Sequence, residues 1–140
     1  MTTRLTRFPG GIVVGGGPGN NRATSASVLC SMRATFDPTS AAQILLGTLP
    51  VGARVVDVVS EGGGTGGTNP TVDVGTVATS DGFANELKAN AVSSAVAAVT
   101  GGTLLGTLLT VATPVYGKVG ASAATGGTTT VRVVYTVETF

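Results

Sequence analysis

Alternating hydrophobic and polar positions mark two clear strands near the two ends of the main body of the chain. In residues 27–36 the apolar side chains fall at every second position, on a face that holds Val28, Cys30, Met32, Ala34 and Phe36. Residues 129–137 repeat this pattern, with one face made of Val131, Val133, Tyr135 and Val137. A period of two residues is typical of a strand with one buried face. Both segments are therefore predicted to be strands.

Three further segments alternate in the same way: residues 54–60, 71–77 and 115–121. In the first of them, Val55, Asp57 and Val59 are predicted to share one face. In the second, Val72 and Val74 are predicted to point into the core. The Val and Thr content of these segments agrees with the spacing, because both residue types suit a pleated, half-buried surface.

Three segments carry no single clear pattern. Residues 41–49 fit either a short strand or one helical turn. Residues 83–99 have a partial helical spacing, although their Ser, Asn and Val content disfavours a helix. Residues 104–113 could hold one or two short strands. The element type of these segments stays open at the level of the sequence.

Glycine, proline and asparagine divide the chain into an arm and a body. Residues 1–26 include the breaker run 15–21, and a short apolar run precedes it: Ile12, Val13 and Val14. This part is predicted to be an extended arm. Residues 27–140 are predicted to form the body.

Glycine-rich turns separate the predicted strands of the body. Turns are predicted at Asp81-Gly82 and at Gly126-Gly127, where the two glycines would punctuate a hairpin. Short alternating strands between such turns are typical of all-β architectures. The predicted fold is therefore all-β, a β-sandwich or jelly roll with an extended basic N-terminal arm.

Charge is scarce in the chain and unevenly placed. Charged residues make up 11% of the sequence, against about 25% in an ordinary soluble domain. Residues 1–36 carry four arginines and no acid, whereas the residues after them carry seven acids and four basic side chains. A basic arm on a slightly acidic body is predicted to lie on a negative surface of a protein or a nucleic acid. Because only 4% of the residues are aromatic, the signal for nucleic acid is weak.

The residue types needed for several kinds of active site are missing from the sequence. There is no His, which excludes a Ser-His-Asp or Cys-His pair within this chain. The single Cys30 cannot form an internal disulfide, and without His it cannot complete a zinc site. It is predicted to be a buried structural thiol. No catalytic residue, cofactor or metal site is predicted.

A carboxylate pair is the remaining route to acid–base catalysis. Asp57 and Asp73 fall in neighbouring predicted strands and could approach each other. The favoured alternative is that both face solvent or pair with Arg54 or Arg132. Asp73 or Asp81 could also join a calcium site, but the repeated acidic spacing of a calcium loop is absent.

A glycine motif follows one of the predicted strands. Gly62, Gly64 and Gly67 match the spacing GxGxxG. A dinucleotide site also needs a helix that opens at the last glycine. Because Asn69, Pro70 and another predicted strand follow here, the match is attributed to the Gly-rich composition of the loop.

Residues 89–117 hold no charged side chain, which raises the question of a membrane span. Asn, Ser, Thr, Gly and Pro interrupt the stretch, whereas a spanning helix needs about 20 mainly apolar residues. The stretch is predicted to be buried or subunit-facing, and no membrane association is predicted. Residues 1–11 contain two arginines and a proline, and they lack the apolar core of a secretory signal.

Several segments together resemble small virion structural proteins of tailed bacteriophages, which include capsid decoration, or cement, proteins. The similar segments are residues 3–11 (TRLTRFPGG), 49–58 (LPVGARVVDV), 69–76 (NPTVDVGT), 114–119 (PVYGKV) and 130–135 (TVRVVY), with Asp81-Gly82-Phe83 between them. The resemblance implies a sandwich or jelly-roll body that oligomerises, often as a homotrimer, on the exterior of the capsid after assembly in the host cytoplasm. It carries no catalytic residues over.

The resemblance leads to a functional prediction. The chain is expected to be a non-enzymatic capsid decoration protein that stabilises the head by binding across subunits of the major capsid protein. The residues expected to contact the capsid lie in the arm, and they are Arg4, Arg7, Phe8, Ile12 and Val13. The alternatives are a head-fibre or tail-associated virion protein that binds a host surface, and a small β-fold enzyme that uses the carboxylate pair.

Overall fold

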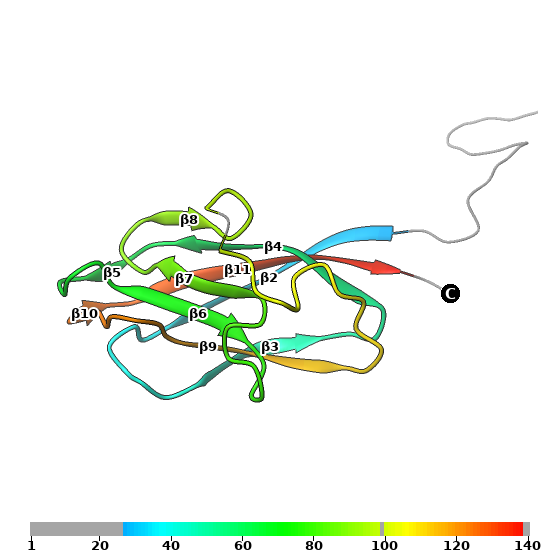
Figure 1. Ribbon diagram of the computed structural model, residues 1–140, viewed down its shortest axis with the longest axis horizontal. Coiled ribbons are helices and arrows are strands. Elements are labelled where there is room, and N and C mark those ends of the chain that lie inside the picture. The colour runs from blue at the N-terminus through cyan, green and yellow to red at the C-terminus, as the bar shows by residue number, and fades with distance from the viewer. Residues whose placement is uncertain (1–26, 99, 139–140) are drawn as a thin grey trace, which may run out of the picture.

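The protein consists of two four-stranded antiparallel sheets and a short two-stranded ribbon (Figure 1). The computed structural model describes residues 27–98 and 100–138. The β2 sheet contains, in order across the sheet, β2 (Ser27–Phe36), β11 (Thr129–Glu138), β4 (Ala53–Glu61) and β8 (Val92–Ser94). The β3 sheet contains β3 (Ile44–Leu49), β9 (Thr113–Val119), β6 (Thr71–Gly75) and β7 (Ala84–Lys88). The ribbon pairs β5 (Gly64–Thr65) with β10 (Gly126–Gly127).

The order of the strands identifies the sandwich as a jelly roll. Apart from β6 and β7, which form a hairpin, successive strands of the two sheets alternate between the β2 sheet and the β3 sheet. This alternation places the first strand, β2, beside the last, β11, in one sheet. In the other sheet it places β3 beside β9. Eight strands wound in this way form the double-sheet jelly roll. The predicted all-β fold is confirmed, and the topology selects the jelly roll.

The core lies between the two sheets and takes side chains from both. Its largest fully buried members include Phe83, Leu49 and Leu87. The inward positions predicted for residues 71–77 and 129–137 are confirmed at Val72, Val74, Val131 and Val133, which are all buried. Alternation therefore located the buried face of these strands correctly.

In β4 the predicted faces are wrong after Val55, because the strand contains a bulge. Its pairing with β11 jumps from Asp57 to Val55, which leaves Val56 without a partner. An extra residue in one strand shifts the alternation by one position. As a result Val55 and Val58 are buried, whereas Asp57 lies on the outer face.

The segments left open by the sequence are now assigned. The helical option for residues 83–99 is wrong, because this segment forms β7 and β8. Residues 41–49 contain β3, and residues 104–113 form a loop that touches β4 through an isolated bridge between Arg54 and Leu108.

The predicted hairpin at Gly126-Gly127 is also wrong. The strands before and after these glycines, β9 and β11, lie in different sheets. The glycines themselves pair with Gly64 and Thr65 as the short ribbon. The connection that contains them crosses from one sheet to the other.

Candidate interaction surfaces

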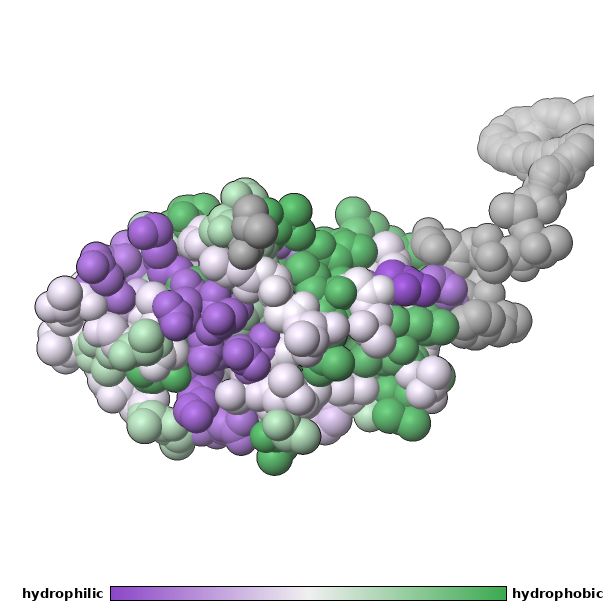
Figure 2. Space-filling view, in the orientation of Figure 1, coloured by the Kyte–Doolittle hydropathy of each residue, from purple (hydrophilic) through white to green (hydrophobic). Residues whose placement is uncertain are grey.

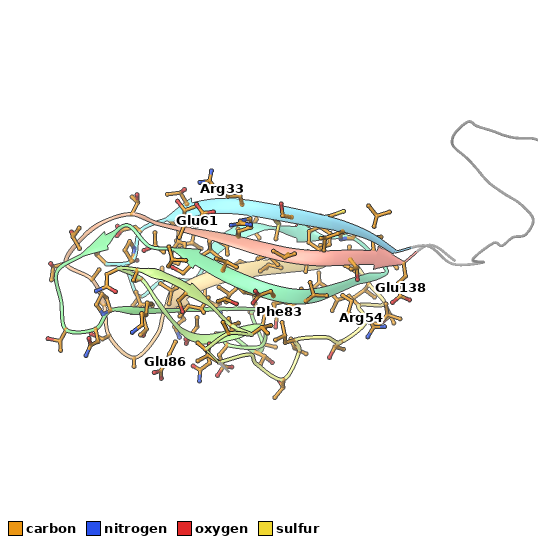
Figure 3. The ribbon with its side chains drawn as sticks, turned by 90° about the horizontal axis from the view of Figure 1, so that it is seen from above. Arg33, Arg54, Glu61, Phe83, Glu86 and Glu138 are labelled. Atoms are coloured by element: carbon orange, nitrogen blue, oxygen red, sulfur yellow. The ribbon has the colours of Figure 1, made fainter. Side chains whose placement is uncertain are left out.

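The outer face of the β2 sheet carries an ion cluster that links three strands (Figure 3). Arg33 on β2 donates to Glu61 on β4, with 2.6 Å between Nη2 and Oε1. Arg132 on β11 donates to the same carboxylate, with 3.3 Å between Nε and Oε2. Arg33 and Arg132 are directly opposed in the β2–β11 register, so Glu61 lies between two like charges. The hydrogen bond from Arg33 is the main reason why the pKa of Glu61 lies below its ordinary value.

A second ion pair lies at the opposite end of the same face (Figure 3). Arg54 on β4 donates to Glu138 at the end of β11, with 3.1 Å between Nη2 and Oε2. Arg54 Nη1 also donates to the carbonyl oxygen of Gly106 at 2.6 Å. Arg54 and Arg132 are both paired with glutamates, so the expected alternative in which they pair with Asp57 or Asp73 is wrong.

Asp57 and Asp73 do not form a carboxylate pair, because they lie in different sheets. Asp57 accepts hydrogen bonds from Ser94 Oγ at 2.7 Å and from the amide of Val96 at 3.1 Å, and so holds the turn after β8. Asp73 accepts from the amide of Glu86 at 2.7 Å. Val58 on β4 and Val72 and Val74 on β6 are buried in the shared core, so the two carboxylates beside them face outward on opposite sides of the sandwich. The acid–base interpretation of this pair is wrong.

A polar groove lies beside β7, with a volume of about 240 Å³. Its lining includes Asn69, Glu86, Lys88, Asn90 and Ser93. Two of these residues adopt a left-handed backbone conformation, with φ of 47° at Asn69 and 56° at Glu86. Figure 2 shows hydrophilic residues gathered over the middle of this view and toward the end that holds β5 and β10. Hydrophobic residues gather toward the other end.

Nine large apolar side chains are exposed among the described residues. Three of them lie on β2 and β3, namely Val28 (55% exposed), Leu29 (68%) and Leu45 (56%). These two strands are the edge strands of the two sheets and contact each other. We call this side of the sandwich the β2–β3 edge. Alternation predicted β2 but left β3 undecided, and the position of both strands at the edge follows only from the pairing.

The arm residues predicted to contact the capsid lie outside the described residues; they are Arg4, Arg7, Phe8, Ile12 and Val13. Cys30 is only partly buried on β2, where its thiol donates to the carbonyl oxygen of Val28 at 3.8 Å, so the prediction of a buried thiol holds in part. The glycine motif at residues 62–67 contains β5 and leads into β6, a strand.

Within residues 27–98 and 100–138, no three His, Cys, Asp or Glu side chains are grouped so that they could hold a metal ion. The same residues include no helix with the length and apolarity needed to cross a membrane.

The ion cluster predicts a specific pH dependence. Glu61 has a lowered pKa in the folded protein, so the cluster adds stability above the unfolded value of about 4.3. This contribution is lost as the pH falls through the folded pKa. The Glu61→Gln variant is therefore expected to unfold at a lower temperature than the wild type at pH 7, and the difference should shrink steadily below about pH 4. Thermal unfolding followed by circular dichroism between about pH 2.5 and pH 7 measures this.

Asp73 provides a control of opposite sign. Burial is the main cause that raises the pKa of Asp73 in the folded protein. The charged carboxylate therefore destabilises the folded state above that pKa, and protonation at lower pH removes this destabilisation. Asp73→Asn retains an oxygen that can accept from the Glu86 amide. The stability of the Asp73→Asn variant relative to the wild type is expected to fall as the pH decreases. A Glu61→Gln difference that is constant with pH would contradict the assigned ion cluster.

The topology and the outer surfaces together define an all-β jelly-roll protein, and two solved structures share this fold. No family model matches the sequence, and no curated protein gives a significant match. A chain in the capsid asymmetric unit of cyanophage Pam1 is similar over 86% of this chain and 91% of its own length, with a TM-score of 0.58 and 24% identity. A chain in the acid-stable capsid of Helicobacter pylori bacteriophage KHP30 is similar over 84% of this chain and 99% of its own length, with a TM-score of 0.57 and 18% identity.

Proposed function

We propose that this chain is a non-enzymatic bacteriophage capsid decoration protein, which stabilises the head from outside by binding across subunits of the major capsid protein. The observation that supports it most is the jelly roll shared with chains of two phage capsid structures. The similarity spans 91% and 99% of those chains, so each of them is a small chain of about the size of this one. The shared fold therefore fits a small accessory component of a virion.

The surfaces of the molecule suit a protein that acts by packing. Each additional contact across a joint between capsid subunits is repeated by the symmetry of the particle, so modest interfaces sum to a large stabilisation. The exposed apolar side chains of the β2–β3 edge and the low charge of the chain favour burial against neighbours. A homotrimer is the assembly proposed here, and native mass spectrometry of the purified protein tests it.

The arm is the proposed attachment segment. Residues 1–26 carry three arginines and no acid, and they precede β2 directly. Arginines in an arm can pair with an acidic shell, while Phe8, next to Arg7, supplies an apolar anchor. These contacts would hold the arm on the capsid surface.

Removing two of these charges tests the attachment. The double variant Arg4→Ala/Arg7→Ala is expected to bind undecorated capsid particles about tenfold more weakly, because each lost ion pair contributes roughly 0.5–1 kcal/mol. Co-sedimentation with the particles at several salt concentrations measures the occupancy. Lys118→Ala, which removes a positive charge from β9 in the body, is the matched control and should bind like the wild type. Unchanged occupancy of the double variant would contradict the role of the arm.

A head-fibre or tail-associated protein that binds a host surface is the second candidate. The groove beside β7 favours it, because amide, hydroxyl and charged side chains are among its lining and can bind a polar ligand. Quantitative mass spectrometry of purified virions separates the two functions. Hundreds of copies per particle, near one for each capsid subunit, support decoration, whereas a dozen or fewer support the second candidate.

A further inference from the structure

The outer edge of β2 has no backbone partner among the described residues. β2 pairs with β11 over its whole length, from Ser27 opposite Glu138 to Phe36 opposite Thr129. In an antiparallel strand every second residue directs its N–H and C=O groups away from its partner. About half of the ten residues of β2 therefore offer free hydrogen-bonding groups along this edge. β3, the edge strand of the other sheet, lies beside it.

The opposite side of the sandwich is partly covered by the chain itself. The loop after β8 pairs with β7, where the Asn85 amide donates to the Thr100 carbonyl at 2.8 Å. Further along, the amides of Gly106 and Leu109 donate to β4 at Val55 and Ala53, both at 2.8 Å. The fold thus covers part of β7 and the stretch of β4 beyond β8 with its own backbone, and no described residue does the same for the β2–β3 edge.

The side chains of the β2–β3 edge favour addition of another strand. Natural proteins protect open edges with charged residues, prolines or bulges. The pairing of β3 shifts register between Leu45 and Gly47, whereas β2 has neither a bulge nor a proline, and its single charged residue, Arg33, is already bound by Glu61. The apolar side chains of Val28 and Leu29 are more than half exposed at the start of β2. Such an edge binds an extended segment through its backbone, and neighbouring side chains select the segment.

We propose that the edge of β2 binds residues 12–14 of a second copy of this chain, so that the arm of one copy extends the sheet of the next. This inference rests on the proposed function, because it assigns the contact that joins decoration subunits to one another. Ile12, Val13 and Val14 form a run of three consecutive β-branched residues in the arm. Residues 15–26 can span about 40 Å when extended, which exceeds the length of β2, about 33 Å. The adjacent copy is therefore within reach.

Charge and symmetry favour a second copy as the occupant. Residues 1–26 carry three arginines and no acid, whereas residues 27–138 carry seven acids and five basic side chains. The arm of one copy is thus complementary to the body of another. An arm bound to the edge of the next copy is a heterologous contact, which can close into a ring such as a trimer. Pairing of β2 with β2 would instead be isologous and give a dimer.

The single native cysteine provides a direct test. Cys30 lies on β2, and directly paired residues of adjacent strands have Cα atoms about 4.5–5.5 Å apart, within the range of a disulfide. Ile12→Cys, Val13→Cys and Val14→Cys are made separately in the full-length protein to sample the register. After mild oxidation, at least one variant is expected to give disulfide-linked oligomers on a non-reducing gel, with the arm peptide joined to the Cys30 peptide by mass spectrometry.

Two controls accompany these variants. Adding Cys30→Ser should abolish the linked species. Ala78→Cys, an exposed position in the loop between β6 and β7, should give no linked species at the same protein concentration.

Three outcomes would overturn the inference. A disulfide within one chain would mean that the arm binds its own edge. Absence of any linkage, with β2 amides that exchange rapidly in the free protein and become protected only on capsid particles, would identify the shell as the occupant. Absence of both linkage and protection would mean that the edge stays open. Binding of the protein to capsid particles is measured separately. If no arm-to-Cys30 disulfide forms but the protein still binds the particles, this inference alone is contradicted. If the disulfide forms but the protein does not bind the particles, the proposed function alone is contradicted.

Discussion

Replacing Phe83 by alanine is expected to destabilise the protein by about 3–5 kcal/mol, the range for removing a large aromatic side chain from a core. Phe83 is fully buried, and its amide donates to the Val74 carbonyl at 2.9 Å. The void left by the ring lies between two sheets that are held by many other contacts, so it can collapse only in part. Urea unfolding measures the change, as a lower midpoint with an unchanged slope.

An exposed position in the neighbouring loop supplies the control for this experiment. Val77 is 64% exposed, so Val77→Ala should change the unfolding free energy by less than about 0.5 kcal/mol. The same two variants link stability to the proposed function. Small domains are typically stable by about 5–15 kcal/mol, so Phe83→Ala would raise the unfolded fraction and lower capsid occupancy on warming. A Phe83→Ala midpoint equal to that of Val77→Ala would contradict the position of this ring in the core.

Replacing Gly102 by alanine is expected to destabilise the protein by about 2–3 kcal/mol through a steric conflict with backbone atoms. A Cβ atom at this position would run into the carbonyl oxygens of Asp81 and Gly82. These oxygens belong to the main chain and cannot move aside as a flexible side chain would. The loop that closes the β7 edge must therefore shift outward. Hydrogen exchange measures this locally, because the amide of Asn85, which donates to Thr100 in the wild type, should exchange faster.

Gly106 in the same loop separates this steric effect from backbone strain. A Cβ atom there meets nothing within 4 Å, but the residue has a φ of 83°. Gly106→Ala should therefore cost only the left-handed conformation, about 1 kcal/mol, and leave exchange at Asn85 unchanged. Equal effects of the two substitutions on both measurements would contradict the close approach at Gly102.

The architecture explains why the two sides of the sandwich differ in their proposed roles. The connection between β8 and β9 is long enough to return along β4 and β7 and to satisfy their backbone groups. The connection between β2 and β3 is short and leaves the outer edges of both strands unpaired among the described residues. A partner that supplies an extended segment can therefore add a strand along the open edge of β2.

Local spacing was sufficient to predict the class of fold and several strands. Burial of one face of a strand requires apolar residues at every second position, and β2, β6, β9 and β11 follow this rule closely. The turn residues between them indicated short connections, and the all-β fold followed from both. The positions of Val72, Val74, Val131 and Val133 in the core could be predicted for the same reason.

The partner of each strand, and with it the arrangement of the surface, was decided by the tertiary structure. Asp57 and Asp73 looked like neighbours along the chain, but the jelly-roll winding places β4 and β6 in opposite sheets. The bulge at Val56 reversed the faces of half a strand, and an ion cluster joined Arg33, Glu61 and Arg132 from three strands. Period-two spacing records only whether a face is buried. Pairing, bulges and open edges depend on contacts between residues far apart in the sequence, which no local pattern contains.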